Sequence, residues 1–186
     1  MKYTDFGNGI FTVDNFFSIE ECTYWIQKSE EIGYEEAKVG LGRKQVLMKS
    51  VRNNERLIYD NTDLAVELWE RIKGFVPKET YLGKAIGLNE RFRFYRYYPG
   101  QEFKPHQDGS FIRNIHEWSS FTFMIYLNED MIGGATKFGT LSIQPKMGKA
   151  LIFKHELIHQ GCKVIEGVKY VLRTDVMYRR KNKMNN

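Results

Sequence analysis

The sequence predicts a single α+β domain in which an antiparallel β core follows a helical half. Residues 1–90 carry two helical patterns, whereas residues 91–178 carry short segments that are rich in aromatic and β-branched residues and separated by turn signals. No helical pattern lies between those segments, which argues against a parallel βαβ fold and for a sandwich or barrel. A length of 186 residues suits one domain with its own core.

Two segments of the first half have helical signals. Ser18 followed by Glu21 is a capping-box pattern, and it predicts a helix that ends near Gly33. A second helix is predicted from about Asp63 to Phe75, where apolar residues recur at helical spacing. We expect both helices to cover one face of the sheet.

The second half is predicted to consist of strands. The predicted strands are 91–98, 121–128, 136–145, 149–154 and 169–178. The expected organisation is one domain over residues 1–178, with helical support from 1–90, a β core from 91–178, and a basic tail at 179–186.

The charge distribution argues against a nucleic-acid partner. The net charge is +5, but the last eight residues hold four of the 28 basic residues and none of the 23 acidic ones. The remainder is nearly neutral. No apolar run approaches the roughly 18 to 20 residues of a membrane span, and the first residues do not fit a signal peptide. Two cysteines form no CxxC motif. We therefore expect a cytoplasmic protein without a membrane partner.

The segment KPHQDGS contains a possible metal-binding pair, His106 and Asp108. Side chains at i and i+2 of a strand lie on one face and can share an ion. A hydrated turn is the alternative interpretation, because an isolated HxD is common. An Fe(II) centre with two histidines and one carboxylate needs one further histidine, and the candidates are His116, His155 and His159.

A basic side chain follows the last of these histidines at a fixed spacing. Lys169 stands ten residues after His159 and begins a predicted strand on which Lys169, Val171 and Arg173 share one face. A cation that points into a barrel needs an anionic partner, which a dicarboxylate co-substrate would supply. A surface lysine at the start of a strand is the alternative.

Several segments resemble one enzyme family. The segments FYRYYPGQEFKPHQDGS, FTFMIYLNEDMIGGATKF, ALIF and HQGCKVIEGVKYVLRTDVMY are similar to the prolyl 4-hydroxylase-like branch of the 2-oxoglutarate- and Fe(II)-dependent oxygenases. The resemblance covers residues 91–178 in the order of the family. Its most specific parts are the GGxTxF element, which begins at Gly133, and the spacing from His159 to Lys169.

The resemblance implies a double-stranded β-helix, or jelly-roll, core. It also implies that His106, Asp108 and His159 are the iron ligands and that Lys169 binds the distal carboxylate of 2-oxoglutarate. The implied reaction uses O2, converts 2-oxoglutarate to succinate and CO2, and hydroxylates an unactivated C–H bond. Ascorbate is a further candidate cofactor.

The resemblance also points to tyrosines beside the co-substrate. Tyr126 and Tyr97 match positions where family members place tyrosines, although Tyr95 and Tyr98 are alternatives to Tyr97. Thr122 lies on the same strand face as Tyr126 and is a further pocket candidate.

The substrate is less determined than the chemistry. A peptidyl proline or a small molecule is expected, and a free amino acid or another metabolite is the alternative. A different class is a cupin-like metal-binding protein without oxygenase activity. Arg173 and three loop arginines (Arg52, Arg56 and Arg113) are candidates for binding a substrate carboxylate. The oligomeric state is left open.

Overall fold

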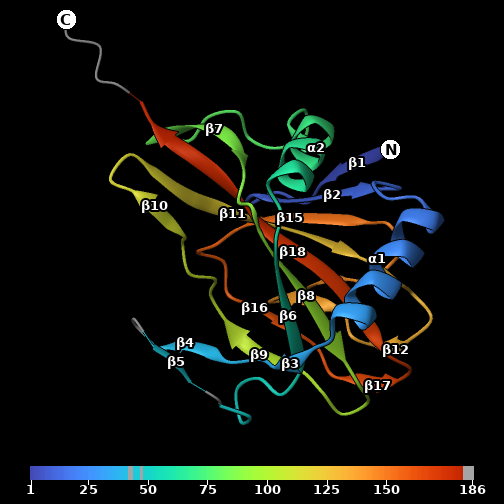
Figure 1. Cartoon of the computed structure of the whole chain (residues 1–186). Coiled ribbons are helices and arrows are strands. Elements are labelled where there is room, and N and C mark those ends of the chain that lie inside the picture. Colours follow the sequence, from blue (N-terminus) through green and yellow to red (C-terminus); the bar gives the residue numbers. More distant parts are fainter. Residues whose placement is uncertain (42–43, 47, 182–186) are drawn as a thin grey trace, which may run out of the picture.

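The computed structural model describes residues 1–41, 44–46 and 48–181. Within these ranges, a ten-stranded sheet faces a four-stranded sheet, and two helices lie on the outer side of the larger sheet (Figure 1). Two further two-stranded sheets, β4 (Val39–Leu41) with β5 (Lys44–Val46) and β12 (Ile132–Gly133) with β17 (Val164–Glu166), complete the described part of the chain. This two-layered arrangement confirms the predicted jelly-roll core.

The larger sheet combines strands from both halves of the chain. In spatial order its strands are β1 (Lys2–Asp5), β2 (Ile10–Asp14), β15 (Ala150–Lys154), β11 (Glu117–Tyr126), β18 (Lys169–Arg180), β8 (Arg91–Tyr97), β6 (Glu55–Asp60) and β3 (Glu35–Glu36). In addition, β10 (Ile112–Asn114) pairs with β11, and β7 (Gly83–Leu88) pairs with β18. The smaller sheet has the order β14 (Leu141–Ile143), β13 (Thr136–Phe138), β16 (His159–Gly161) and β9 (Phe103–His106).

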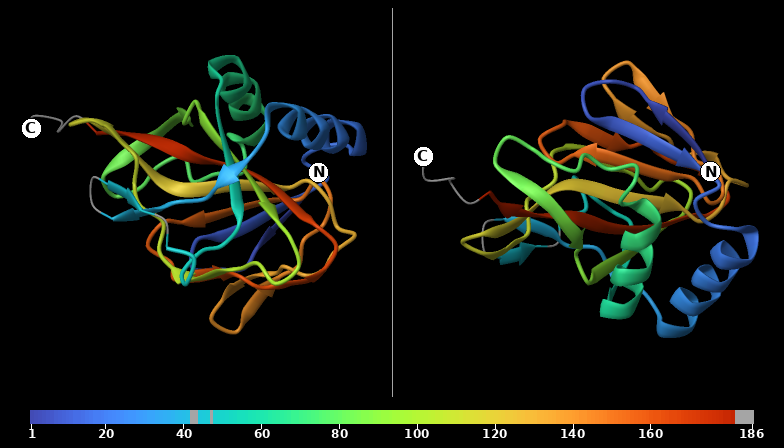
Figure 2. Two further views of the ribbon diagram at one scale, coloured as in Figure 1. Left: turned by 60° about the horizontal axis from the view of Figure 1, so that its bottom comes forward. Right: turned by 90° about the horizontal axis from the view of Figure 1, so that it is seen from above.

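Both predicted helices form. Helix α1 (Ile19–Ile32) begins with the expected capping box, because the Ser18 hydroxyl accepts from the Glu21 amide and the Glu21 carboxylate accepts from the Ser18 amide. Helix α2 (Thr62–Ile72) is capped by the Asn61 side chain and ends slightly earlier than expected. Figure 2 shows the two helices on the same side of the large sheet.

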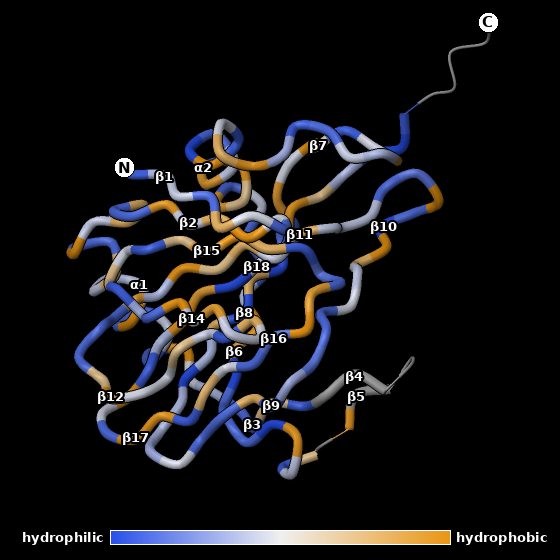
Figure 3. Tube along the Cα trace, turned by 180° about the vertical axis from the view of Figure 1, so that it is seen from behind, coloured by the Kyte–Doolittle hydropathy of each residue, from blue (hydrophilic) through white to orange (hydrophobic). Residues whose placement is uncertain are grey.

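Strand alternation gives the large sheet two apolar faces. Phe94 of β8, Phe123 of β11 and Leu172 of β18 belong to the cluster under the helices, which also contains Leu68 of α2. In Figure 3 the apolar stretches, drawn in orange, include β15 of the large sheet and β14 of the smaller sheet. Because both faces of the large sheet are covered, the sequences of its central strands are nearly continuous apolar runs.

The opposite face of the same strands points toward the smaller sheet. Tyr97, Tyr126, Phe153 and Val171 form a second buried cluster with Ile143 of β14. The chemistry-bearing side chains of the second half lie on this inner face, so the two-layer architecture encloses the pocket described below.

The expectation that residues 1–90 are mainly helical was wrong. Strands β1, β2, β6 and β7 lie in this half, and three of them pair with strands more than 30 residues away: β2 with β15, β6 with β8, and β7 with β18. Their stability comes from partners distant in sequence, which a local pattern does not record.

Two smaller expectations also change. The predicted strand 136–145 is divided into β13 and β14, and β18 continues through Arg180, so the basic tail begins later than position 179. Residues 182–186 lie outside the described residues. None of the helices in the described ranges is long and apolar enough to cross a membrane.

Candidate metal centre and its pocket

Two strands of the smaller sheet bring together three metal-ligating side chains. His106 ends β9, His159 begins the adjacent β16, and the two residues are register partners. Asp108 follows β9, and one donor atom from each of the three residues lies within 4.8 Å of the others. The Nε2 atoms of His106 and His159 lie 3.8 Å and 3.7 Å from the Asp108 carboxylate. These separations are too long for hydrogen bonds, so the three groups are neighbours that are not bonded to one another.

Backbone carbonyls orient both imidazole rings. Nδ1 of His106 lies 2.7 Å from the Lys104 carbonyl oxygen, and Nδ1 of His159 lies 3.0 Å from that of Leu157. A carbonyl can only accept, so each Nδ1 donates and each Nε2 keeps its lone pair. Burial lowers the pKa of His106 to about 4 and also lowers that of His159, which keeps both rings neutral near pH 7.

This donor set fits a divalent iron ion. Two neutral imidazoles and one carboxylate on one side of a pocket form the facial arrangement that leaves coordination positions open for other ligands. The other two histidine candidates lie elsewhere. His155 is buried, with Nε2 3.5 Å from Asp175, and His116 is exposed in the β10–β11 turn.

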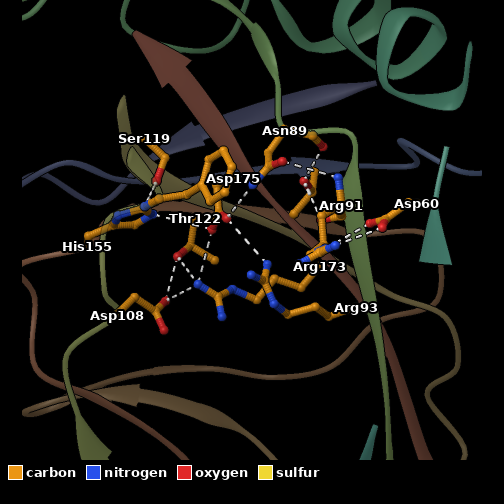
Figure 4. A network of polar contacts seen from close by, with 12 residues as sticks. Asp60, Asn89, Arg91, Arg93, Asp108, Ser119, Thr122, His155, Arg173 and Asp175 are labelled. Atoms are coloured by element: carbon orange, nitrogen blue, oxygen red, sulfur yellow. Dashed lines mark hydrogen bonds and ion pairs between the residues drawn. The ribbon is translucent and has the colours of Figure 1, made fainter. Parts of the chain in front are cut away.

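A buried polar network fixes the carboxylate of Asp108 (Figure 4). The Thr122 hydroxyl donates to Oδ2 at 2.5 Å, and Nη2 of Arg173 lies 3.1 Å from the same oxygen. Burial opposes ionisation of Asp108, but the charge of Arg173, the neighbouring histidines and the Thr122 hydrogen bond together outweigh it and lower the pKa. Arg173 is in turn paired with Asp175 at 3.1 Å. The ligand carboxylate therefore stays ionised and has one orientation.

Lys169 lies in the same pocket. It is 3% exposed, and its ammonium donates to the Gly134 carbonyl at 2.6 Å and lies over the rings of Tyr97 and Tyr126. Burial lowers its pKa to about 8, and no carboxylate in the described part of the chain lies within ion-pair distance. A buried ammonium is costly without a counter-charge, so this end of the pocket suits an anion.

The GGxTxF element explains how the backbone approaches Lys169 so closely. Gly134 has a φ of +69°, and a Cβ there would lie 3.0 Å from Cδ of the lysine. Two residues later, the Thr136 hydroxyl accepts a hydrogen bond of 2.7 Å from Tyr126. Thr136 also lines the pocket. It is the threonine of the GGxTxF element, but the sequence alone did not predict it as a pocket residue.

The structure distinguishes the two tyrosines of β8, Tyr95 and Tyr97, from Tyr98, which follows the strand. Tyr97 lies against Lys169, and Tyr95 accepts a hydrogen bond from Arg173 at 3.4 Å. Both are buried and line the pocket, whereas Tyr98 is 38% exposed. The strand register pairs Lys169 with Tyr97, which places the tyrosine beside the ammonium.

The four candidate arginines lie in different surroundings. Arg173 lines the pocket, and the guanidinium of Arg52 lies over Tyr95 and Phe103, two other pocket residues. Arg56 is buried on β6, outside the pocket lining. Arg113 is ion-paired with Glu90 and Glu117, away from the pocket.

Sequence reasoning missed Asp175 altogether. This carboxylate is 2% exposed and lies within ion-pair distance of Arg173, Arg93 and His155. A signal was present, because Asp175 follows Arg173 by two residues on a strand and therefore shares its face. The carbonyls that orient the histidines had no such signal, since a backbone contact leaves no trace in side-chain identity.

Comparisons with known proteins agree with this geometry. A model of the 2OG-Fe(II) oxygenase superfamily matches residues 92–174, which include all three clustered ligands and Lys169. No curated protein matches the chain.

Solved structures of prolyl hydroxylases have a similar fold. A viral collagen prolyl hydroxylase from Paramecium Bursaria Chlorella virus-1, solved with 2-oxoglutarate, has a TM-score of 0.66 at 22% identity over 92% of this chain and 97% of that chain. A Pseudomonas putida prolyl-4-hydroxylase has a TM-score of 0.67 at 15% identity over 94% of both chains. A Trichoplax adhaerens prolyl hydroxylase, solved with a hypoxia inducible factor peptide fragment, has a TM-score of 0.67 at 15% identity over 94% of this chain and 84% of that chain.

Proposed function

We propose that the chain is a member of the 2OG-Fe(II) oxygenase superfamily, whose model matches residues 92–174, and that His106, Asp108 and His159 bind the iron of a C–H hydroxylase. The enzyme is a dioxygenase that uses Fe(II), 2-oxoglutarate and O2. In the reaction 2-oxoglutarate is decarboxylated to succinate and CO2, and one oxygen atom enters the substrate C–H bond. Bound iron supplies the redox chemistry that links these two events.

The residues of the chain supply binding and orientation. Lys169 binds the distal carboxylate of 2-oxoglutarate, and the walls of that end of the pocket come from Tyr97, Tyr126 and Thr136. Thr122 and Arg173 act through Asp108, because both of them contact its Oδ2 atom. They are therefore positioning residues for the metal.

One observation supports this proposal most strongly: the uncompensated ammonium of Lys169 lies in the same pocket as the three metal ligands. A cupin-like metal-binding protein without oxygenase activity needs the three ligands but has no use for this cation. The buried lysine therefore favours the oxygenase over that alternative.

Two substrate classes are compatible with the site, and we propose a prolyl residue of a peptide as the first of them. The prolyl hydroxylases with a similar fold favour it, and one of them was solved with a peptide. A free amino acid or another small metabolite is the second class, because the pocket has buried cations of its own. We place the reaction in the cytoplasm, without nucleic-acid or membrane partners, and with ascorbate as a candidate cofactor.

Succinate formation tests the proposal. Purified protein supplied with Fe(II), O2 and 2-oxoglutarate should release succinate, and His106→Ala and Asp108→Ala should abolish this turnover. Both variants should also lose tight binding of Fe(II) in an anaerobic titration, which is a readout independent of activity. His116→Ala is the matched control, because it removes an exposed histidine outside the pocket. Full turnover in either ligand variant would contradict the metal site.

A further inference from the structure

We propose that the substrate carries a carboxylate and that Arg52 binds it, on the side of the pocket formed by Tyr95 and Phe103. This inference rests on the proposed hydroxylase function and narrows its substrate class. It assigns to one of the four candidate arginines a role that the other three do not share.

Arg52 is a buried cation with an unused donor. The residue is 5% exposed, its Nε donates to the Asn54 side chain at 2.6 Å, and its Nη2 is buried without a hydrogen-bond partner. No carboxylate in the described ranges lies within ion-pair distance of it. An uncompensated buried guanidinium is costly, and a bound anion would supply both the missing charge and the missing acceptor.

The guanidinium of Arg52 lies next to the candidate metal site. Its Cζ lies 4.3 Å from the centre of the Tyr95 ring and 4.5 Å from that of Phe103, and both residues line the pocket. Phe103 in turn stacks on His106, with ring centres 3.4 Å apart. A small molecule or a peptide side chain that presents a C–H bond to the metal would therefore be long enough to place its own carboxylate on Arg52.

The other charges of the pocket leave Arg52 without a counter-ion. Asp175 lies within ion-pair distance of both Arg93 and Arg173, and Asp108 is shared by Arg173 and the metal. The two carboxylates of 2-oxoglutarate are assigned to Lys169 and to the metal. A further anion is required, and the substrate is the remaining component.

Tyr95 supplies a second donor for this anion. Its hydroxyl accepts from Arg173 and donates to no group within the described ranges, so its proton is available. Burial alone would raise the pKa of this phenol, but Arg52, Arg173 and Arg93 outweigh burial and lower it to about 8. Such a polarised hydroxyl is a strong donor to a carboxylate.

The number of donors favours a carboxylate over a phosphate. One free Nη2 and one phenol match the two oxygens of a carboxylate. A phosphate dianion has three oxygens to satisfy, and neither helix of the described ranges begins among the residues that line the pocket to offer further amides.

The test compares substrates that differ only in charge. Succinate released above the substrate-free rate is measured for the wild-type Fe(II) enzyme with the L-amino acids and their amides. Proline-containing peptides with an acidic or a neutral neighbour, each with a free or amidated C-terminus, form the second arm. We expect turnover with the carboxylate form of an active compound to exceed that with its neutral form by about tenfold or more. Activity with free amino acids identifies a metabolite, and activity with peptides alone identifies a peptide carboxylate.

Variants assign the effect to Arg52. Arg52→Gln should raise the KM for the carboxylate substrate by about tenfold or more, while the KM for 2-oxoglutarate stays within about twofold, and Arg52→Lys should restore part of the loss. Unchanged 2-oxoglutarate kinetics also show that the variant is folded. Arg91→Gln is the control, because it removes an exposed arginine paired with Asp60.

Three results would overturn the inference: equal turnover of charged and neutral forms, an unchanged substrate KM in Arg52→Gln, or no response to any carboxylate in the panel. If wild-type enzyme releases no succinate under any condition, the proposed oxygenase function fails instead.

Discussion

The Nη2 atom of Arg173 lies 3.1 Å from Oδ2 of Asp108, so the candidate metal-ligating carboxylate is also one partner of a buried ion pair. A cation next to a metal ligand reduces the negative charge available to the metal. The same contact, however, prevents rotation of the carboxylate. The Thr122 hydroxyl donates to the same Oδ2 atom, so the orientation of the carboxylate depends on both contacts.

Thr122→Val should weaken metal binding by about 10- to 100-fold, because it removes a hydroxyl that holds a ligand carboxylate. Thr122→Ser keeps the hydroxyl and should bind nearly as wild type does. Anaerobic titration with Fe(II) measures both variants. Equal affinity of the valine variant would mean that Arg173 alone is enough to orient Asp108.

Asp175→Asn should destabilise the fold by about 3 to 5 kcal/mol, since it removes the buried counter-charge of Arg93 and leaves Arg173 with Asp108 alone. Urea unfolding measures the change. Asp60→Asn removes an exposed carboxylate that is also paired with an arginine, and it should cost no more than about 1 kcal/mol. Similar losses in the two variants would contradict the role given to Asp175.

The stability supplied by Asp175 should depend on pH. Burial opposes its ionisation, but Arg173, His155 and Arg93 together outweigh burial and lower its pKa below the ordinary value of 3.8. The contribution is therefore fully present above about pH 4 and is lost as the pH falls through the folded-state pKa. Stability measured from pH 6 down to pH 3 should fall less steeply in Asp175→Asn than in the wild type. Parallel curves would exclude Asp175 as a source of acid sensitivity.

Lys169→Met should raise the apparent KM for 2-oxoglutarate by about 30-fold or more, because a buried charge pair is lost. The wild-type kcat/KM for 2-oxoglutarate should decline as the pH rises above about 8, where the free lysine loses its proton. Lys169→Arg should abolish this decline, since arginine remains charged. An unchanged KM in Lys169→Met would transfer the role to Arg173.

Gly134→Ala should also raise the KM for 2-oxoglutarate, because its Cβ would lie 3.0 Å from the Lys169 side chain. Gly139→Ala is the matched control. Its φ of +56° imposes a comparable backbone strain, but its Cβ would meet nothing within 4 Å. The two variants should lose similar stability, and only Gly134→Ala should change the kinetics. A kinetic effect in both would point to a general disturbance of the fold.

The β core and the helices could be predicted because their signals are local. Ser18 and Glu21 are three residues apart, and the strand segments carry their own composition. Strands β6 and β7 could not be predicted, because each is stabilised by a partner distant in the sequence. The reason is physical. The hydrogen bonds of a helix cap lie within one turn of the helix, whereas the backbone hydrogen bonds of a strand are made with a distant part of the chain.

The candidate site divides in a similar way. His106, Asp108, His159 and Lys169 were chosen from spacing and resemblance, and the structure gathers them in one pocket. The sequence did not distinguish Arg52 from Arg113, because both lie in polar segments without periodicity. Their difference is one of surroundings, since Arg113 has two acidic partners and Arg52 is buried without one.

The strand β18 contributes both Lys169 and Arg173 to the inner face of the pocket. Their backbone separation is four residues, or about 13 Å at the usual rise of a strand. This spacing is set by covalent geometry and is insensitive to how the sheets pack. The strand thus fixes the backbone separation between the lysine proposed to bind the distal carboxylate of 2-oxoglutarate and the arginine that holds the candidate metal ligand Asp108, and no side-chain substitution alters this separation.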